Sequence, residues 1–259
     1  MVNSISLNFH KDSLSFKLVR SLTANISTML LLSRCLLLGL LLLISSSAQA
    51  ARPMVIDDAR VVDAKSCQLE SWLKATENRQ EFWALPACNF TENTEVTLGG
   101  AKLKDGDQQD QNNVFQIKHL LKAMQQSHSG YALSLGNVHY RLDKQAQSGD
   151  DVYATLISSH PYYSDHLILH TNLGLLRADQ NNQYRTTWGL GAEYQLKADL
   201  WMMGEIYGQR TSVPSYQAGL RYWLIDQHFQ VDTTFGSTTD HAESWISLGV
   251  RFLSVPFLP

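Results

Sequence analysis

Apolar and polar side chains alternate along the last third of the chain, from Gly191 to Phe252. The stretch 216–224 illustrates the pattern. One of its faces carries Tyr216, Ala218, Leu220, Tyr222 and Leu224. Successive side chains of a β-strand point to opposite faces, so a period of two predicts strands that each have one apolar face. The medium that this apolar face contacts decides the class of protein.

A short apolar run at residues 36–44 follows Arg34 and precedes the small-residue pattern that ends at Ala50. These are the three regions of a secretory signal peptide, and the run is too short for a membrane-spanning helix. We therefore predict a signal peptide over residues 1–50, cleaved near Ala50. Residues 29–50 alone have signal-peptide proportions, which makes Met29 a candidate start, and an unusually long n-region is the alternative. Cys35 belongs to the discarded part.

Cys67 and Cys88 are the only cysteines left after cleavage. An exported chain meets an oxidising compartment, where paired cysteines form disulfides. A polar turn at 77–79 lies midway between them, so antiparallel pairing sets the two cysteines opposite each other. We predict a structural Cys67–Cys88 disulfide, with two free thiols as the alternative.

The composition favours an all-β membrane protein. Charged residues make up 17% of the chain, whereas a soluble protein has about 25%. The net charge of −3 argues against nucleic-acid binding. Many short alternating segments without helical periodicity indicate strands.

Twelve candidate strands follow the signal peptide. They span residues 66–75, 80–90, 94–103, 113–124, 130–141, 151–160, 165–177, 183–196, 199–210, 215–225, 229–237 and 244–253. An even number is what a single-chain outer-membrane barrel requires, and such barrels alternate short periplasmic turns with long outer loops. Polar links at 104–113, 143–150, 179–182 and 237–243 are expected to be the extracellular loops. The segment 113–124 is the weakest of the twelve, since it also fits a short amphipathic helix.

We therefore predict an all-β fold, an antiparallel up-and-down transmembrane β-barrel of about 12 strands over residues 66–253. A polar, irregular N-terminal periplasmic extension precedes it at 51–65, and a tail follows at 254–259. The predicted location is the bacterial outer membrane. Outer-membrane lipid and the barrel-assembly machinery are the expected partners.

The polar faces of the last five predicted strands carry balanced charges. They are Glu193, Glu205, Arg221, Asp232 and Arg251. If the apolar faces meet lipid, these side chains point into the lumen, where opposite charges on neighbouring strands can pair. We expect Glu205, Arg221, Asp232 and Arg251 to meet as one paired network that braces the barrel. A solute-selecting constriction is the alternative. Inward Met203, Tyr207, Trp223 and Trp245 also allow a partly apolar lumen, or serve as packing residues.

The sequence carries no recognisable catalytic or metal motif. Ser159 and His160 are adjacent on one strand and so point to opposite faces, and no Gly-x-Ser-x-Gly elbow occurs. The nine histidines have no metal-ligand spacing. We expect no enzyme activity, no cofactor and no metal.

Two regions resemble the MetA-pathway of phenol degradation family of outer-membrane barrels. They are the opening 51–58 with 67–70, and the closing stretches 204–207, 216–223, 230–236 and 248–252. The resemblance implies an outer-membrane barrel of about this size with a transporter-like role. This chain departs from the usual barrel ending, because it continues for seven residues past Phe252.

Three functions fit these observations. The first is a channel for passive passage of small solutes, hydrophobic or aromatic ones included. The second is a non-conducting structural or adhesive barrel that acts through its outer loops, above all 104–113. The third, a lipid hydrolase, would need a single essential serine.

Overall fold

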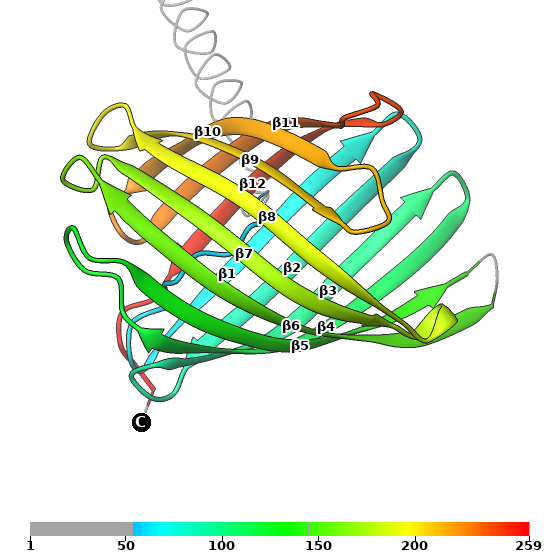
Figure 1. Cartoon of the computed structure of the whole chain (residues 1–259), viewed down its shortest axis with the longest axis horizontal. Helices are drawn as coiled ribbons and strands as arrows, with labels where there is room; N and C mark the ends of the chain where they lie inside the picture. Colours follow the sequence, from blue (N-terminus) through cyan, green and yellow to red (C-terminus); the bar gives the residue numbers. More distant parts are fainter. Residues whose placement is uncertain (1–53, 144–145, 259) are drawn as a thin grey trace, which may run out of the picture. The chain divides into compact units, whose positions relative to one another are not determined.

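Twelve strands form a closed barrel in the computed structural model, which describes residues 54–143 and 146–258 (Figure 1). The strands are β1 Ser66–Thr76, β2 Arg79–Asn89, β3 Thr94–Asp105, β4 Gln108–Lys122, β5 Gly130–Leu142, β6 Gln147–Tyr162, β7 Leu167–Ala178, β8 Gln183–Gln195, β9 Leu200–Gln209, β10 Ser215–Ile225, β11 Phe229–Thr238 and β12 Ser244–Leu253. One turn of 3-10 helix, η1 Asp179–Asn181, joins β7 to β8.

Each strand pairs antiparallel with its neighbour in sequence, and β12 closes the barrel by pairing with β1. The closing register sets Gln68 opposite Leu253 and Thr76 opposite Trp245. This confirms the predicted up-and-down barrel and the number of its strands. In the part of the chain described, no helix is long and apolar enough to cross a membrane.

The strands turn their apolar faces outward, as the period of two predicts. Large apolar side chains are exposed around the barrel, such as Leu98 at 59%, Leu173 at 56% and Ile246 at 60% of their surface. The alternate positions are buried, including Thr97, Asn172 and Ser247. An exposed apolar band around a polar interior reverses the arrangement of a soluble sandwich and is the pattern of a membrane barrel.

The predicted long loop at 104–113 is wrong. β3 continues to Asp105 and β4 begins at Gln108, so Gly106 and Asp107 alone connect them. Gly106 adopts a φ of +59°, a left-handed conformation that glycine accepts without strain. The other polar residues of 104–113 extend the two strands of the hairpin. Pairing between strands satisfies the backbone N–H and C=O groups whether the side chains are polar or apolar. The segment 113–124, for which a short amphipathic helix was the alternative, belongs largely to strand β4.

The expected alternation of short and long connections is also absent. Residues 77–78 join β1 to β2, and 123–129 join β4 to β5. The link 123–129 is the longest connection between described strands, and it lies at the predicted periplasmic end, where short turns were expected. The two ends of the barrel differ instead in their strands, since β4 and β6 extend past the apolar band at the end where 106–107 lies.

The C-terminal tail is bound to the beginning of β1. Ser254 N donates to the Cys67 carbonyl at 2.9 Å, and Cys67 N donates to Ser254 Oγ at 2.9 Å. Phe257 N donates to the Lys65 carbonyl at 2.9 Å. The predicted signal peptide, with Met29, Cys35 and Ala50, lies outside the described residues.

Candidate functional site

The lumen of the barrel is the candidate site, because the polar and charged side chains of the strands gather there. The five charged residues predicted to face inward are at positions of low exposure. Glu193 and Glu205 are each 6% exposed, Arg221 is 8% exposed and Asp232 is fully buried. Charges at such positions must be paired, since an unpaired buried charge is costly.

Arg221 is the centre of the strongest group of charges. The register sets Arg221 on β10 directly opposite Asp232 on β11. Its Nη2 lies 3.0 Å from Asp232 Oδ2, and its Nη1 lies 2.6 Å from Glu193 Oε1 on β8. A planar guanidinium can serve two carboxylates at once, which a lysine ammonium cannot do with the same geometry.

The other two predicted charges bond elsewhere. Arg251 Nε donates to Gln68 Oε1 at 2.7 Å and lies 3.4 Å from Glu70 Oε1, so it pairs with β1. Glu205 accepts from Gln217 Nε2 at 2.7 Å. Within the described residues, Arg221 bonds directly to Asp232, whereas Arg251 and Glu205 also bond to side chains outside the predicted group. Arg251 and Glu205 bind these partners. The alternation of side chains along each strand predicts the face of a residue but not its partner on another strand.

The main partner of Glu205 comes from the N-terminal segment, residues 54–65. This segment has no strand, as its composition predicts, but it does not form an extension outside the barrel. Val55 N and Ile56 N donate to the two carboxylate oxygens of Glu205, at 2.8 and 2.9 Å. Met54, Ile56, Ala59 and Val62 are buried. The segment lies inside the lumen because its backbone finds hydrogen-bond partners there.

Four more side chains of the wall hold the backbone of this segment. Asn172 Oδ1 accepts from Asp57 N at 2.8 Å, and Asn172 Nδ2 donates to the Asp57 carbonyl at 2.8 Å. Ser159 Oγ accepts from Ala59 N at 2.8 Å. Glu95 accepts from Val62 N at 2.9 Å, and Asn89 donates to the Val62 carbonyl at 2.8 Å.

Ion pairs add to these hydrogen bonds. Lys118 Nζ on β4 lies 2.8 Å from Asp57 Oδ1 and 3.7 Å from Asp58 Oδ1. Arg60 Nη2 lies 2.6 Å from Asp58 Oδ2 and 3.0 Å from Glu193 Oε2. Burial alone would raise the pKa of Asp58, but the charges of Arg60 and Lys118 hold this pKa well below its usual range.

A gap in the wall receives Ile56. Gly189 and Gly191 lie on the inward face of β8, where a Cβ added at Gly189 would overlap the Ile56 side chain. A Cβ added at Gly191 would lie 3.4 Å from Ile56 Cβ. The two glycines leave the space that this side chain fills, which is a close approach that any larger residue at 189 would prevent.

The sequence did not reveal this docked segment. Asp57 and Asp58 belong to a polar, irregular stretch, and the partners of Asp57, Lys118 and Asn172, lie 61 and 115 residues further along the chain. Two signals point to it in retrospect. Lys118 places a charge on the inward face of β4 between Gln116 and Leu120, and Gly189 and Gly191 repeat on the inward face of β8.

Two cavities lie in the lumen on the side of the N-terminal segment that faces away from Lys118 and Glu193. One has a volume of about 360 Å³ and is lined by Trp72, Trp83, Tyr153, Tyr207 and Trp245. The second, of about 490 Å³, shares Val55, Tyr153 and Tyr207 with it and reaches Ser212 and Val213 in the β9–β10 turn. We call the two together the aromatic vestibule. Of the four inward residues predicted to make the lumen partly apolar, Trp245 and Tyr207 line it.

The rings of the aromatic vestibule are fixed in place. Trp72 and Trp83 face each other across β1 and β2 and stack with their ring centroids 5.3 Å apart. Trp245 Nε1 donates to Gln217 Oε1 at 2.9 Å, and Lys74 Nζ lies 4.4 Å from the centre of the Trp245 ring. Tyr153 donates its hydroxyl to Gln116 at 2.7 Å. These contacts hold the rings that line the vestibule in fixed positions.

Serine and histidine do come together, although not as adjacent residues. Ser159 Oγ lies 2.8 Å from His170 Nδ1 across the β6–β7 ladder, and Ser129 Oγ lies 2.7 Å from His160 Nδ1. Ser159 is fully buried and also accepts from Ala59 N, so the docked segment covers this hydroxyl. Within the described residues, no group of three or more His, Cys, Asp or Glu is placed to hold a metal ion.

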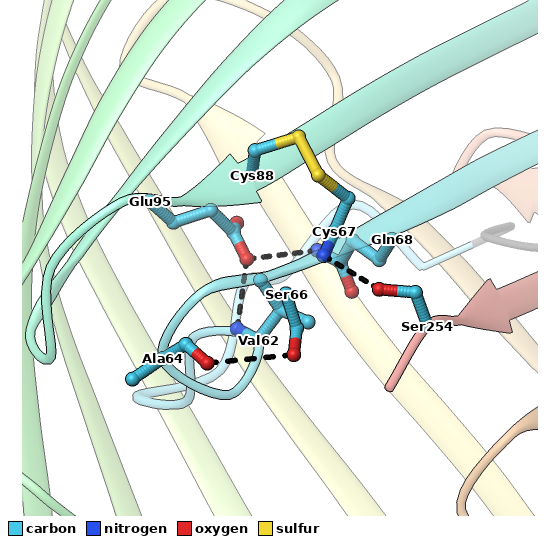
Figure 2. Close-up of a disulfide and its surroundings, with 8 residues drawn as sticks. All are labelled: Val62, Ala64, Ser66, Cys67, Gln68, Cys88, Glu95 and Ser254. Atoms are coloured by element: carbon cyan, nitrogen blue, oxygen red, sulfur yellow. Dashed lines mark hydrogen bonds between the residues drawn. A yellow bond between two sulfur atoms is a disulfide. The ribbon is translucent and has the colours of Figure 1, made fainter. Parts of the chain in front are cut away.

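The disulfide is confirmed and lies at the end of the barrel where the N-terminal segment enters (Figure 2). Cys67 and Cys88 are directly opposite in the β1–β2 register. On the inward side of the wall beside the disulfide, Gln68 Nε2 on β1 donates to Glu95 on β3 at 3.1 Å, and Glu95 also accepts from Val62 N (Figure 2). A bridge that closes such a loop contributes about 3 kcal/mol to stability.

One comparison with known proteins identifies the family of this chain. A family model described as "Uncharacterised conserved protein UCP029691" matches residues 39–253. The resemblance to the MetA-pathway of phenol degradation family is not confirmed. No curated protein matches the sequence.

Solved porin structures are similar to this chain. The KdgM porin in complex with disordered oligogalacturonate matches at a TM-score of 0.52 and 10% identity, covering 72% of this chain and 98% of the porin. The NanC porin matches at a TM-score of 0.52 and 9% identity, with the same coverage. At such identities the likeness establishes a porin-like barrel fold and nothing about what passes through it.

Proposed function

This chain belongs to the family described as "Uncharacterised conserved protein UCP029691", and we propose that it is a channel for passive passage of small solutes across the bacterial outer membrane. The observation that carries the proposal is the aromatic vestibule, a solute-sized space inside a closed barrel whose outward face is apolar. The outward band contacts outer-membrane lipid, and insertion requires the barrel-assembly machinery.

The wall of the vestibule favours planar aromatic solutes. Trp72, Trp83 and Trp245 line it, and aromatic rings attract another ring by offset-stacked or edge-to-face contact. Lys74 and Glu81 also line this space, so a charged group on the solute finds a partner of either sign. A ring that carries one charged substituent is the class of solute that fits this lining best.

A non-conducting barrel is the second candidate, and one observation favours it. The N-terminal segment passes through the lumen at the level of Arg221 and Lys118, where the cavity between them measures about 30 Å³. Action through a long outer loop has less support, since 104–113 belongs to two strands of a hairpin.

Conductance decides between the candidates. The purified barrel is placed in planar bilayers, both as the full mature chain and with residues 54–62 deleted. We expect current in at least the deleted form. If neither form conducts while both migrate as folded barrels in unheated gels, the channel proposal fails and the non-conducting barrel replaces it.

Liposome flux tests the solute class. We expect benzoate to pass about fivefold faster than cyclohexanecarboxylate, since one aromatic contact is worth about 1 kcal/mol. Trp83→Leu should remove this preference. Trp223→Leu is the matched control, because Trp223 faces inward on β10 but does not line the vestibule. Equal flux of the two solutes would contradict the aromatic class and leave the channel itself standing.

A further inference from the structure

We infer that residues 54–62 are an autoinhibitory plug, which folds back into the lumen after export and closes the channel. The inference rests on the proposed channel function and adds a closed state to it. The plug begins at Met54 beside the aromatic vestibule and runs past Glu193 and Glu95 toward the start of β1.

The wall is built to hold an irregular stretch of backbone. A segment outside any strand has no ladder partner for its N–H groups, and each buried one must find an acceptor. Side chains of five different strands bond the plug, and they are Asn89, Glu95, Ser159, Asn172 and Glu205. These hydrogen-bond donors and acceptors follow one path of the chain through the lumen, which a chance contact of a tail would not do.

Charge and shape match along the same path. Lys118 on β4 meets Asp57, and Glu193 on β8 meets Arg60, so each partner cancels a charge that burial would penalise. Ile56 fills the gap over Gly189 and Gly191. Removal of the plug would leave Lys118 and Glu193 facing a water-filled lumen, where water would hydrate them.

The plug closes the lumen to solutes. Between the plug and the charged wall lies a cavity of about 30 Å³, room for about one or two water molecules. A further cavity of about 210 Å³ lies along the wall between Trp83, Tyr153 and Glu95. The vestibule offers about 360 and 490 Å³ in its two parts. Both spaces beside the plug are smaller than the vestibule, so we expect the plug to stop a solute that the vestibule admits.

A crosslink tests the docked position without reference to conduction. Ile56→Cys and Gly191→Cys place two Cβ atoms about 3.4 Å apart, close to the separation of a disulfide. The native cysteines are already joined to each other. Mild oxidation of the double variant should form a second internal disulfide, seen by mass after proteolysis. Ile56→Cys with Gly204→Cys, which lies on the outward face of β9, is the control and should not crosslink.

Conductance tests the closing role. Deletion of residues 54–62, and separately Gly189→Leu, should each raise the conductance severalfold above that of the full mature chain. Gly204→Leu adds the same side chain to the outward face and should leave conductance unchanged. Migration as a folded barrel in unheated gels is required of every variant.

The outcomes separate the two proposals. A crosslink together with raised conductance supports both. Absence of the crosslink in a folded double variant overturns the docked plug. A crosslink with equal conductance of the full and deleted chains overturns the closing role and keeps the channel. No conductance in any variant overturns the channel, and the closing role falls with it.

Discussion

At the scale of single residues, Arg221 has the most consequential side chain in the lumen. Its guanidinium serves Glu193 and Asp232, both of which are buried. Gln230 also approaches Asp232, from two positions earlier on β11. A group of this kind contributes less through its attraction than it would cost if one member were removed.

Arg221→Ala is therefore expected to destabilise the barrel by about 3–5 kcal/mol, because it leaves two buried carboxylates without their cation. Arg221→Lys should cost less but not be neutral, since one ammonium cannot fork to both carboxylates. The temperature at which the folded band disappears in gels measures the effect. Lys102→Ala, at an exposed position on β3, is the control. Equal stability of the Arg221→Ala and Lys102→Ala variants would contradict the pairing.

Asp58 is a second residue whose environment predicts a measurable effect. Its pKa in the folded chain is depressed by Arg60 and Lys118, against the opposing effect of burial. A depressed pKa means that the carboxylate stabilises the folded state fully above the unfolded value of about 3.9 and loses this contribution as the pH falls through the folded pKa.

We therefore expect Asp58→Asn to lower the unfolding temperature at pH 7. The difference from the wild type should shrink as the pH falls below about 4, since the unfolded wild type then takes up a proton at position 58 while the folded chain does so only near its own, lower pKa. Unfolding temperatures of the two chains between pH 7 and pH 2.5 measure this. A difference that stays constant across this range would show that the ion pairs of Asp58 do not stabilise the fold.

At the scale of elements, the β3–β4 hairpin corrects the expected architecture most clearly. Residues 104–113 belong to the ladders of β3 with β4 and of β4 with β5, where Asn112 pairs with both Ala101 and Tyr140. Deletion of this stretch would break two ladders instead of trimming a loop. A change confined to Gly106 and Asp107 leaves all of this pairing intact.

An epitope inserted between Gly106 and Asp107 should be tolerated and should bind antibody on intact cells, because the even number of strands puts this turn outside when both chain ends lie in the periplasm. An epitope inserted after Gln227, in the β10–β11 turn at the opposite end, is the control and should bind antibody only after the outer membrane is opened. The reverse pattern would invert the orientation of the barrel and place the plug at the outer end.

At the scale of the whole molecule, the strands were predictable because each carries its own signal. The period of two depends only on neighbours in sequence, so the predicted strand 215–225 agrees with β10, and 244–253 agrees with β12. The same period assigned Glu193, Arg221 and Asp232 to one face. The polar stretch 104–113 was wrongly predicted as a loop. Polar side chains indicate only contact with water, and a hairpin that extends beyond the membrane contacts water just as a loop does.

The sequence by itself determined a closed antiparallel barrel of twelve strands, the Cys67–Cys88 bridge and the faces of the charged residues, since alternation and register are local properties. Only the tertiary structure decided what fills the lumen. Asp57 meets Asn172, and Val55 meets Glu205, through contacts that span 115 and 150 residues. The segment that makes them has no period of its own, so its position depends entirely on acceptors and a glycine gap that closure of the barrel brings together.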